Sequence, residues 1–315
     1  MKKSIFLLAL LIIYIDSIAQ KIDTASKKDQ QTTTLNAADS LLNSIGSDDK
    51  KTPVIIFKSS RLILSQSSET VKKNNLNFLV IHRFGAFAGK DGGGKLFFGL
   101  DAVADVYIGF EYGITNNLNI DLGRSTIPSP GGLLSLELKY AVLHQTSDDS
   151  SPIAVTLLGT TGLRLYNTYN AFSDRVSYFG QAIFARKFSS GFSFQISPSI
   201  VQDNLPIPNV PGNTEDVFSV SATARFKLSK HMGFIVDYAH PFSSFRNGAG
   251  FSDPLGFGIE AVTGGHVFTI NISNPKAVSE INYLSNTKSD WSRGQYRIGF
   301  TISRMFDFNH KESYK

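Results

Sequence analysis

Twelve segments of this chain alternate apolar residues with small or polar ones, and the gaps between them alternate in length. In FSFQISPSIV (192–201), Phe194 and Ile196 share one face, while Ser193 and Gln195 share the other, because successive side chains of a strand point to opposite sides. The pattern therefore predicts twelve strands with one apolar and one polar face. Their predicted ranges are 76–84, 103–113, 118–124, 132–143, 152–165, 176–188, 192–201, 216–228, 232–239, 256–262, 266–273 and 295–306.

Every second gap is short or modest, as in ITNN (114–117) and SSG (189–191), whereas most of the others are longer, as in 85–102 and 274–294. Antiparallel up-and-down barrels of the outer membrane have short turns at one rim and longer loops at the other. A soluble sandwich with Greek-key connections has no reason to keep this alternation. We therefore predict an all-β fold, a transmembrane antiparallel up-and-down β-barrel of about twelve strands over residues 76–308, followed by a tail at 309–315.

The N-terminus predicts export. Two lysines precede an apolar run, Ile5–Ile15, and Ser17 and Ala19 stand three and one residues before Gln20. This is the pattern of a signal peptide (1–19) cleaved before Gln20, and an eleven-residue run is too short to span a bilayer as a helix. We expect the mature protein in the outer membrane with both termini in the periplasm.

Two further segments precede the predicted barrel. Residues 20–52 are polar and free of aromatic residues, which is typical of a flexible linker. The mixed stretch 53–75 is compatible with a plug inside the barrel or with an extra strand, and its sequence does not decide between them.

Composition excludes several classes of function. The chain has no cysteine, so disulfide scaffolds and cysteine-ligated metal sites are excluded. Its formal net charge is +5, but basic and acidic residues are mixed and no long basic run is present, which argues against binding of nucleic acid.

The sequence carries few signals of catalytic chemistry. GKDGGGK (89–95) has the spacing of a phosphate-binding loop, but Leu96 stands where such a loop needs Ser or Thr, so a glycine-rich extracellular loop is the better interpretation. A hydrolase would need a nucleophile beside a histidine, and only His240 and Asp237 come near one another at a rim. We predict no enzyme activity, no cofactor and no metal site.

The inward face of the predicted barrel carries charges of both signs. Such charges line a wet passage or pair with one another to stiffen the wall, and mixed signs argue against a strongly ion-selective channel. The candidate lumen-lining residues are Arg83, Asp105, Glu111, Asp121, Glu137, Lys139, Arg225, Asp237, Glu260 and Arg297.

Several segments resemble a family of uncharacterised outer-membrane β-barrel proteins of Gram-negative bacteria, a domain of unknown function. The resemblance covers most of the chain from Phe57 to Phe306 and implies a barrel in the outer membrane, without a substrate, catalytic residue or cofactor. The segments are FKSSRLI (57–63), SSET (67–70), IHRFG (81–85), FFGLD (97–101), IGFEYGIT (108–115), GIEAVTGGHVF (258–268) and RIGFTISRMF (297–306).

Two functions fit these observations best. The first is a channel-like barrel that passes or binds a small-molecule solute, and the alternative is a non-transport surface or structural barrel whose extracellular loops bind a partner. An outer-membrane hydrolase ranks third. In each case we expect contact with outer-membrane lipid and with the outer-membrane assembly machinery during biogenesis.

Overall fold

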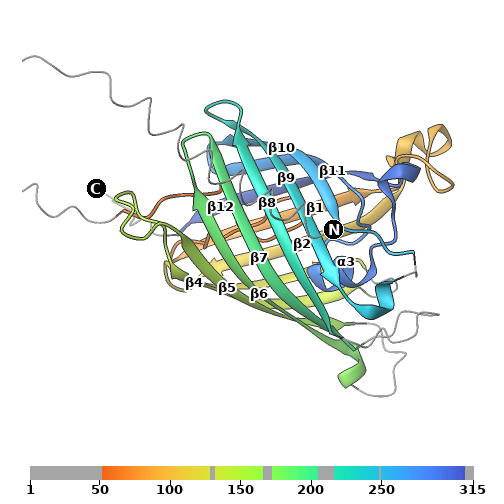
Figure 1. Ribbon diagram of the computed structural model, residues 1–315, viewed down its shortest axis with the longest axis horizontal. Helices are drawn as coiled ribbons and strands as arrows, with labels where there is room; N and C mark the ends of the chain where they lie inside the picture. Colours follow the sequence, from red (N-terminus) through yellow and green to blue (C-terminus); the bar gives the residue numbers. More distant parts are fainter. Residues whose placement is uncertain (1–51, 128–131, 166–171, 205–215, 248–249, 309–315) are drawn as a thin grey trace, which may run out of the picture. The chain divides into compact units, whose positions relative to one another are not determined.

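A computed structural model describes residues 52–127, 132–165, 172–204, 216–247 and 250–308 of the chain, all within the compact unit Lys51–Lys315. Twelve antiparallel strands close into one barrel in which each strand pairs with its neighbours in sequence and β1 pairs with β12 (Figure 1). The predicted twelve-strand up-and-down barrel is therefore confirmed, with strand bounds within three residues of those expected. The strands are β1 (Asn75–Phe84), β2 (Val103–Gly113), β3 (Leu118–Ser125), β4 (Leu133–Leu143), β5 (Ala154–Arg164), β6 (Val176–Lys187), β7 (Phe192–Asp203), β8 (Val217–Lys227), β9 (Met232–Phe242), β10 (Leu255–Thr263), β11 (His266–Ser273) and β12 (Arg297–Asp307).

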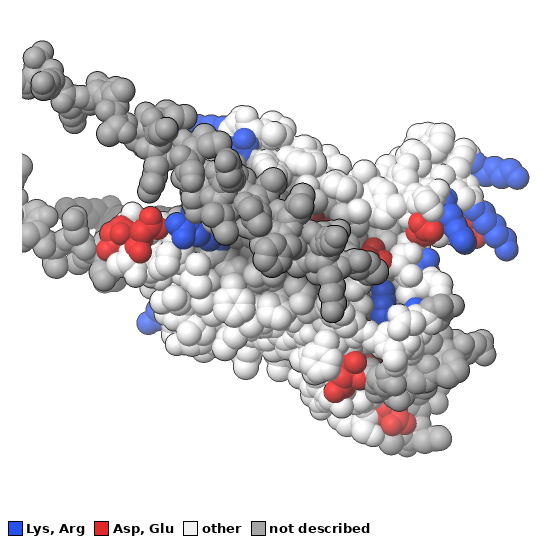
Figure 2. Space-filling model, in the orientation of Figure 1, with Lys and Arg blue, Asp and Glu red and all other residues white. Residues whose placement is uncertain are grey.

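Burial alternates along the strands as the sequence pattern requires. On β2, Ile108 and Phe110 are exposed on the outer face, and Tyr107 and Glu111, which precede and follow them, are buried. On the face shown in Figure 2, charged side chains gather toward the two ends of the barrel, and the visible wall between them is nearly uncharged. An apolar outer band of this kind suits contact with lipid.

The two rims of the barrel differ. The turns that follow β2, β4, β6, β8 and β10 lie at one end, together with the start of β1 and the end of β12, and we name this end the short-turn rim. The connections 85–102 and 274–296 belong to the opposite end, the long-loop rim.

Over the described residues, the helical elements lie in the connections of the long-loop rim. They are the 3-10 turns η1 (Gly94–Gly99), η2 (Ser173–Arg175), η3 (Ser244–Arg246) and η4 (Trp291–Arg293) and the short helix α3 (Glu280–Asn286). Within the described part of the chain, no helix has the length and apolar character that a membrane crossing requires.

A charge placed on the outer face should cost stability according to its depth. Leu138 is exposed in the middle of β4, and Leu143 is exposed at the strand's end near the short-turn rim. We expect Leu138→Arg to lower the free energy of unfolding by about 2–4 kcal/mol and Leu143→Arg by about 0–1 kcal/mol. Denaturant unfolding in phospholipid vesicles, followed by the fluorescence of the single tryptophan, measures both. Equal costs at the two positions would contradict a lipid-facing β4.

Candidate functional site inside the barrel

The chain before β1 folds back into the barrel as a hairpin, residues 53–73, which we name the inner hairpin. It enters at the short-turn rim, where Pro53 pairs with Thr146 and the Val54 N–H donates to Gln145 O at 2.8 Å. Inside, Arg61 pairs with Gln66, and Leu62 N–H donates to Ser65 O at 2.9 Å. The stretch that the sequence left undecided therefore occupies the interior and adds no strand to the closed sheet.

The tip of the inner hairpin is held by Asp237 on β9. The carboxylate accepts the N–H groups of Leu64 and Ser65, each at 2.8 Å, and the Ser65 hydroxyl at 2.7 Å. On β10, a Cβ added to Gly256 would lie 2.7 Å from Ile63 Cγ2, so this glycine leaves a notch that the Ile63 side chain fills. Polar and apolar contacts together fix the tip.

Three carboxylates form a row on the wall facing the hairpin. Glu111 on β2 lies opposite Asp121 on β3, which lies opposite Glu137 on β4. Arg61 of the hairpin is 3.6 Å from Glu137 and lies over the Tyr107 ring, 4.9 Å from its centroid. A guanidinium buried beside this row offsets part of the repulsion among the carboxylates.

Further hydrogen bonds tie the hairpin to the same wall. Glu111 accepts the Ser60 hydroxyl at 2.5 Å, and Glu137 accepts the Gln66 amide at 3.0 Å. The Lys139 ammonium donates to Ser60 O and to Gln66 Oε1, both at 3.1 Å. Glu111, Glu137 and Lys139 on the wall are therefore bound to the inner hairpin.

A second segment, residues 274–296, enters from the long-loop rim, and we name it the inner loop. It carries α3, in which the residues from Glu280 to Ser285 are buried. Arg61 of the hairpin pairs with Glu280 at 3.2 Å, and the Tyr283 hydroxyl donates to Leu64 O at 3.1 Å. The two inserted segments thus meet inside the barrel.

The wall holds the inner loop through its backbone. Arg83 donates to the carbonyl oxygens of Pro275 and Ala277, and also to Ile63 O of the hairpin. Asp105 accepts the Val278 N–H at 2.8 Å, and Arg297 donates to Asn274 O at 2.6 Å.

All ten candidate lumen-lining residues are buried within the described structure. Eight of them contact the inner hairpin, the inner loop or a neighbouring wall group, and Arg225 and Glu260 pair with each other at 2.6 Å. That pair spans β9 because Gly233 leaves room for the guanidinium. The role of these residues in lining a solute path stays a prediction.

The sequence did not reveal four other residues of this network: Arg61, Tyr107, Glu280 and Tyr283. Tyr107 shares the inward parity of Glu111 and could have been found by counting along the strand. The other three belong to the inserted segments, for which strand parity gives no orientation.

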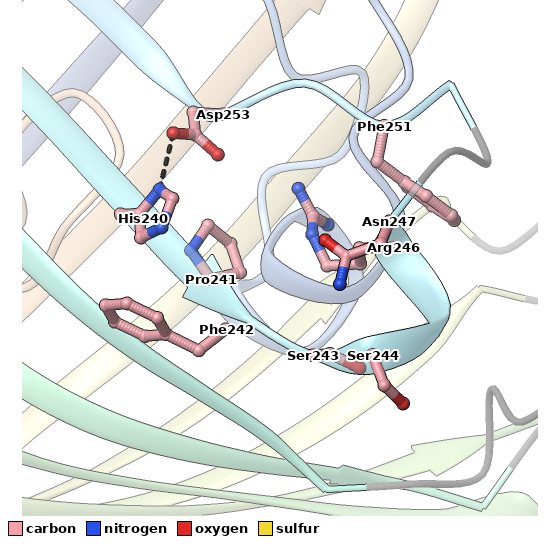
Figure 3. Close-up of a pocket in the computed structure, with 9 residues that line it drawn as sticks. All are labelled: His240, Pro241, Phe242, Ser243, Ser244, Arg246, Asn247, Phe251 and Asp253. Carbon is pink, nitrogen blue, oxygen red and sulfur yellow. Dashed lines mark hydrogen bonds and ion pairs between the residues drawn. The ribbon is translucent and has the colours of Figure 1, made fainter. Parts of the chain in front are cut away.

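A cavity of about 400 Å³ lies at the long-loop rim (Figure 3). His240 Nδ1 is 2.7 Å from Asp253 Oδ2, and the Tyr238 hydroxyl donates to the same oxygen at 2.6 Å. Figure 3 shows Ser243 and Ser244 well away from the His240 ring, which does not favour a serine nucleophile activated by this histidine. The partner of His240 is Asp253, whereas the expected neighbour Asp237 points inward to the hairpin.

The structure gives no support to a phosphate-binding loop at residues 89–95. The glycine-rich stretch 89–95 leads into η1, with Phe97 and Phe98 in left-handed backbone, so no helix N-terminus faces a phosphate there. Over the described ranges, no group of three or more His, Cys, Asp or Glu side chains is placed to hold a metal ion.

Two acidic groups outside the strands have shifted pKa values. Burial raises the pKa of Glu69, although its carboxylate accepts the N–H groups of Phe57 and Ile56. In the inner loop, the backbone N–H and hydroxyl of Ser292 donate to Asp290 and lower its pKa.

Residues 57–306 match the model of a protein family described as a membrane bound beta barrel domain (DUF5777). The chain belongs to this family. Its membrane-bound barrel is thus established by sequence and by fold, and the family description states no substrate. No curated protein matches the chain.

Among solved structures, the chain matches outer-membrane proteins at low similarity. The NanC porin is 11% identical with a TM-score of 0.45, and the match covers 74% of this chain and 100% of the porin. An outer membrane channel from Pseudomonas putida F1 is 10% identical with a TM-score of 0.44, covering 76% and 98%. The outer membrane protein Omp33 of Acinetobacter baumannii is 7% identical with a TM-score of 0.41, covering 74% and 99%. At such TM-scores the likeness carries no argument about this chain.

Removing Arg61 should loosen the inner hairpin. Arg61→Ala leaves Glu137 and Glu280 buried without their cation, so we expect the free energy of unfolding to fall by about 3–5 kcal/mol. Lys95→Ala, in an exposed loop, should change it by less than about 0.5 kcal/mol. Denaturant midpoints of the two purified variants measure the difference. A small effect of Arg61→Ala would show that the apolar contacts of the hairpin suffice to hold it.

Proposed function

We propose that this protein is a gated channel of the outer membrane, closed at rest by its own inner hairpin and inner loop, which passes small polar solutes when they are displaced. It acts without catalysis or a cofactor. One observation carries the proposal: the inward face of the wall is largely polar, and the space is filled by separate segments of the chain. A polar wall can be hydrated once those segments leave the interior.

The inner hairpin suits displacement. Many of its contacts with the wall are hydrogen bonds, such as those from Leu64 and Ser65 to Asp237 and from Lys139 to Ser60, and water replaces such bonds at small net cost. A cavity of about 360 Å³ lies between the hairpin and the wall beside Asn77, His266 and Ser303. We propose this cavity as the vestibule on the short-turn side.

A permanently sealed surface barrel is the second candidate, favoured by a different observation. The hairpin residues Phe57, Leu62 and Leu64 share one apolar cluster with Ile183 and Leu284. Burial of aliphatic side chains in such a cluster stabilises the closed state by about 1.5–3 kcal/mol for each side chain. If these contacts dominate, the hairpin is a fixed core, and function resides in the loops.

Planar-bilayer recordings separate the two candidates. We expect rare stepwise openings of the unmodified protein and at least tenfold more frequent openings of Arg61→Ala, because this substitution removes the ion pairs that join the hairpin to Glu137 and Glu280. Heat-modifiable gel mobility verifies that the barrel is folded. Silence of a folded Arg61→Ala barrel would favour the sealed surface barrel.

A disulfide supplies the matched control. A Cβ at Gly256 would lie 2.7 Å from Ile63 Cγ2, so Cβ atoms of Ile63→Cys and Gly256→Cys would lie within about 4.2 Å, inside the range that disulfides need. Because the chain has no other cysteine, only this bond can form within it. Oxidation should abolish the openings of the Arg61→Ala barrel, and reduction should restore them. Openings that persist in the oxidised protein would show that the path does not require withdrawal of the hairpin tip.

The proposed orientation places the long-loop rim outside the cell and the short-turn rim, with both termini, in the periplasm. It follows from the arrangement of outer-membrane barrels, which have short periplasmic turns. Signal-peptide cleavage before Gln20 and insertion by the outer-membrane assembly machinery belong to the same proposal.

Single cysteines test the orientation on intact cells. Lys90→Cys lies in the long connection after β1, and Ser229→Cys lies in the turn after β8. A membrane-impermeant maleimide should label the first variant strongly, and the second only after the cells are opened. The reverse pattern would invert the assignment, and protection of both sites would exclude the outer membrane as the location.

A further inference from the structure

A column of short hydroxyl side chains lines the inner face of β7 and β8. Ser197 lies opposite Ser221, and Ser199 lies opposite Ser219. All four residues are at least nine-tenths buried. We name these four residues the serine column.

The serine column has unused hydrogen-bonding capacity. Within the described residues, the hydroxyl oxygens of all four serines have no hydrogen-bond partner, and neither has Gln181 Oε1 on β6, directly opposite Ser199. Gln181 is only 6% exposed. Buried polar groups in folded proteins nearly always have a partner, so this number of free oxygens in one place indicates a surface that meets water or a ligand.

The inner loop packs against the strands that carry the serine column. Helix α3 contacts β6, β7, β8 and β9, and its contact with β7 is the most extensive. In Figure 1, α3 lies within the outline of the barrel, toward the long-loop rim. Small side chains on these strands leave room for the helix inside the barrel.

Discrete contacts, rather than a continuous sheet ladder, hold the covering helix. The Tyr283 hydroxyl donates to the hairpin at Leu64 O, and Arg246 Nη1 donates to Leu284 O at 2.9 Å. On β5, a Cβ added to Gly162 would lie 2.8 Å from Ile281 Cδ1, so the Ile281 side chain fills this notch. The inner loop can therefore lose these contacts while the strands of the barrel stay paired.

The serine column carries no net charge. The charged side chains that flank it along β7 and β8 already have partners: Arg164 donates to Asp203 at 2.8 Å at one end, and Arg225 pairs with Glu260 at the other. Hydroxyl and amide groups donate and accept hydrogen bonds without selecting for charge. Such a wall suits uncharged polar solutes, whose hydroxyl or amide groups can replace water along it.

We propose that the serine column with Gln181 is the solute-binding wall of the passage, that its solutes are small uncharged polar molecules, and that the inner loop with α3 is the lid that covers it. This assignment rests on the proposed channel function and specifies its path, its solute class and its moving part. In this proposal the inner hairpin closes the half of the passage next to the short-turn rim, and the lid closes the half next to the long-loop rim.

Two cysteine reporters on the same face of β7 test the lid. Ser197→Cys lies in the serine column, whereas Ser193→Cys, four residues away, lies where the Ser193 hydroxyl donates to Ile56 O of the hairpin. Both are placed in the full-length protein, with and without the lid variant Glu280→Gln/Tyr283→Phe. This variant removes the Tyr283 hydroxyl and replaces the ion pair between Glu280 and Arg61 by at most a hydrogen bond to a neutral amide. The probes are neutral, cationic and anionic methanethiosulfonates of similar size, and rates are normalised to the unfolded protein.

We expect the lid variant to raise the labelling rate of Ser197→Cys by tenfold or more, with the neutral reagent fastest, and to change that of Ser193→Cys by less than twofold. Heat-modifiable mobility verifies folding. An unchanged rate at Ser197→Cys overturns the lid, as does fast labelling there with the lid intact. Faster labelling by a charged reagent overturns the solute class, and an equal rise at both reporters indicates general loosening and also overturns the assignment.

Bilayer recordings of the same variants separate this inference from the proposed function. If the lid variant conducts more but Ser197→Cys stays protected, the channel stands and its path lies elsewhere. If Ser197→Cys becomes reactive but neither the lid variant nor Arg61→Ala conducts, the lid and its wall stand as a closed solute pocket and the channel falls.

Discussion

The backbone ladder between β1 and β12 is the constraint on which the rest of the structure depends. Its register runs from Asn75 opposite Asp307 to Arg83 opposite Gly299. Without it the sheet would have two edges, and unpaired backbone groups are too costly to persist in lipid. Closure turns every second side chain inward, so the polar face that the strands share becomes an interior that must be wetted or filled. Because the inner hairpin leads directly into β1, the chain that closes the sheet also delivers the segment that fills it.

The filling segment and the wall satisfy each other's polar groups. Buried backbone N–H groups at the hairpin tip would be costly alone, and so would a buried Asp237 carboxylate, but each supplies what the other lacks. The same holds for Arg61 between Glu137 and Glu280. Buried ion pairs add little net stability over apolar packing, yet breaking one is costly. Such pairs therefore fix the position of the hairpin, because any position that separates the charges is costly.

The wall was predictable because two-residue periodicity is a local property of a strand that faces lipid on one side. Strand β6 marks the limit of this pattern, because Phe179 and Ile183 point inward, where they join the apolar cluster around the inserted segments, so apolar side chains lie on both faces of the strand. Residues 53–75 and α3 were not predictable for a related reason. Their positions are set by contacts with wall residues distant in sequence, and a seven-residue helix is too short to show helical periodicity.

The contacts between the inner hairpin and the inner loop imply that the two closures are coupled. Arg61 belongs to the hairpin and Glu280 to the loop, and Tyr283 of the loop donates to Leu64 O at the hairpin tip. Withdrawal of either segment therefore leaves the other with an unpaired buried charge or carbonyl group, which lowers the cost of moving it in turn. The glycine notches act in the opposite direction, since the side chains of Ile63 and Ile281 occupy the spaces beside Gly256 and Gly162 in the closed state. Opening is then expected to be stepwise, with the notches setting the cost of the first movement and the loss of the shared ion pair making the second movement easier.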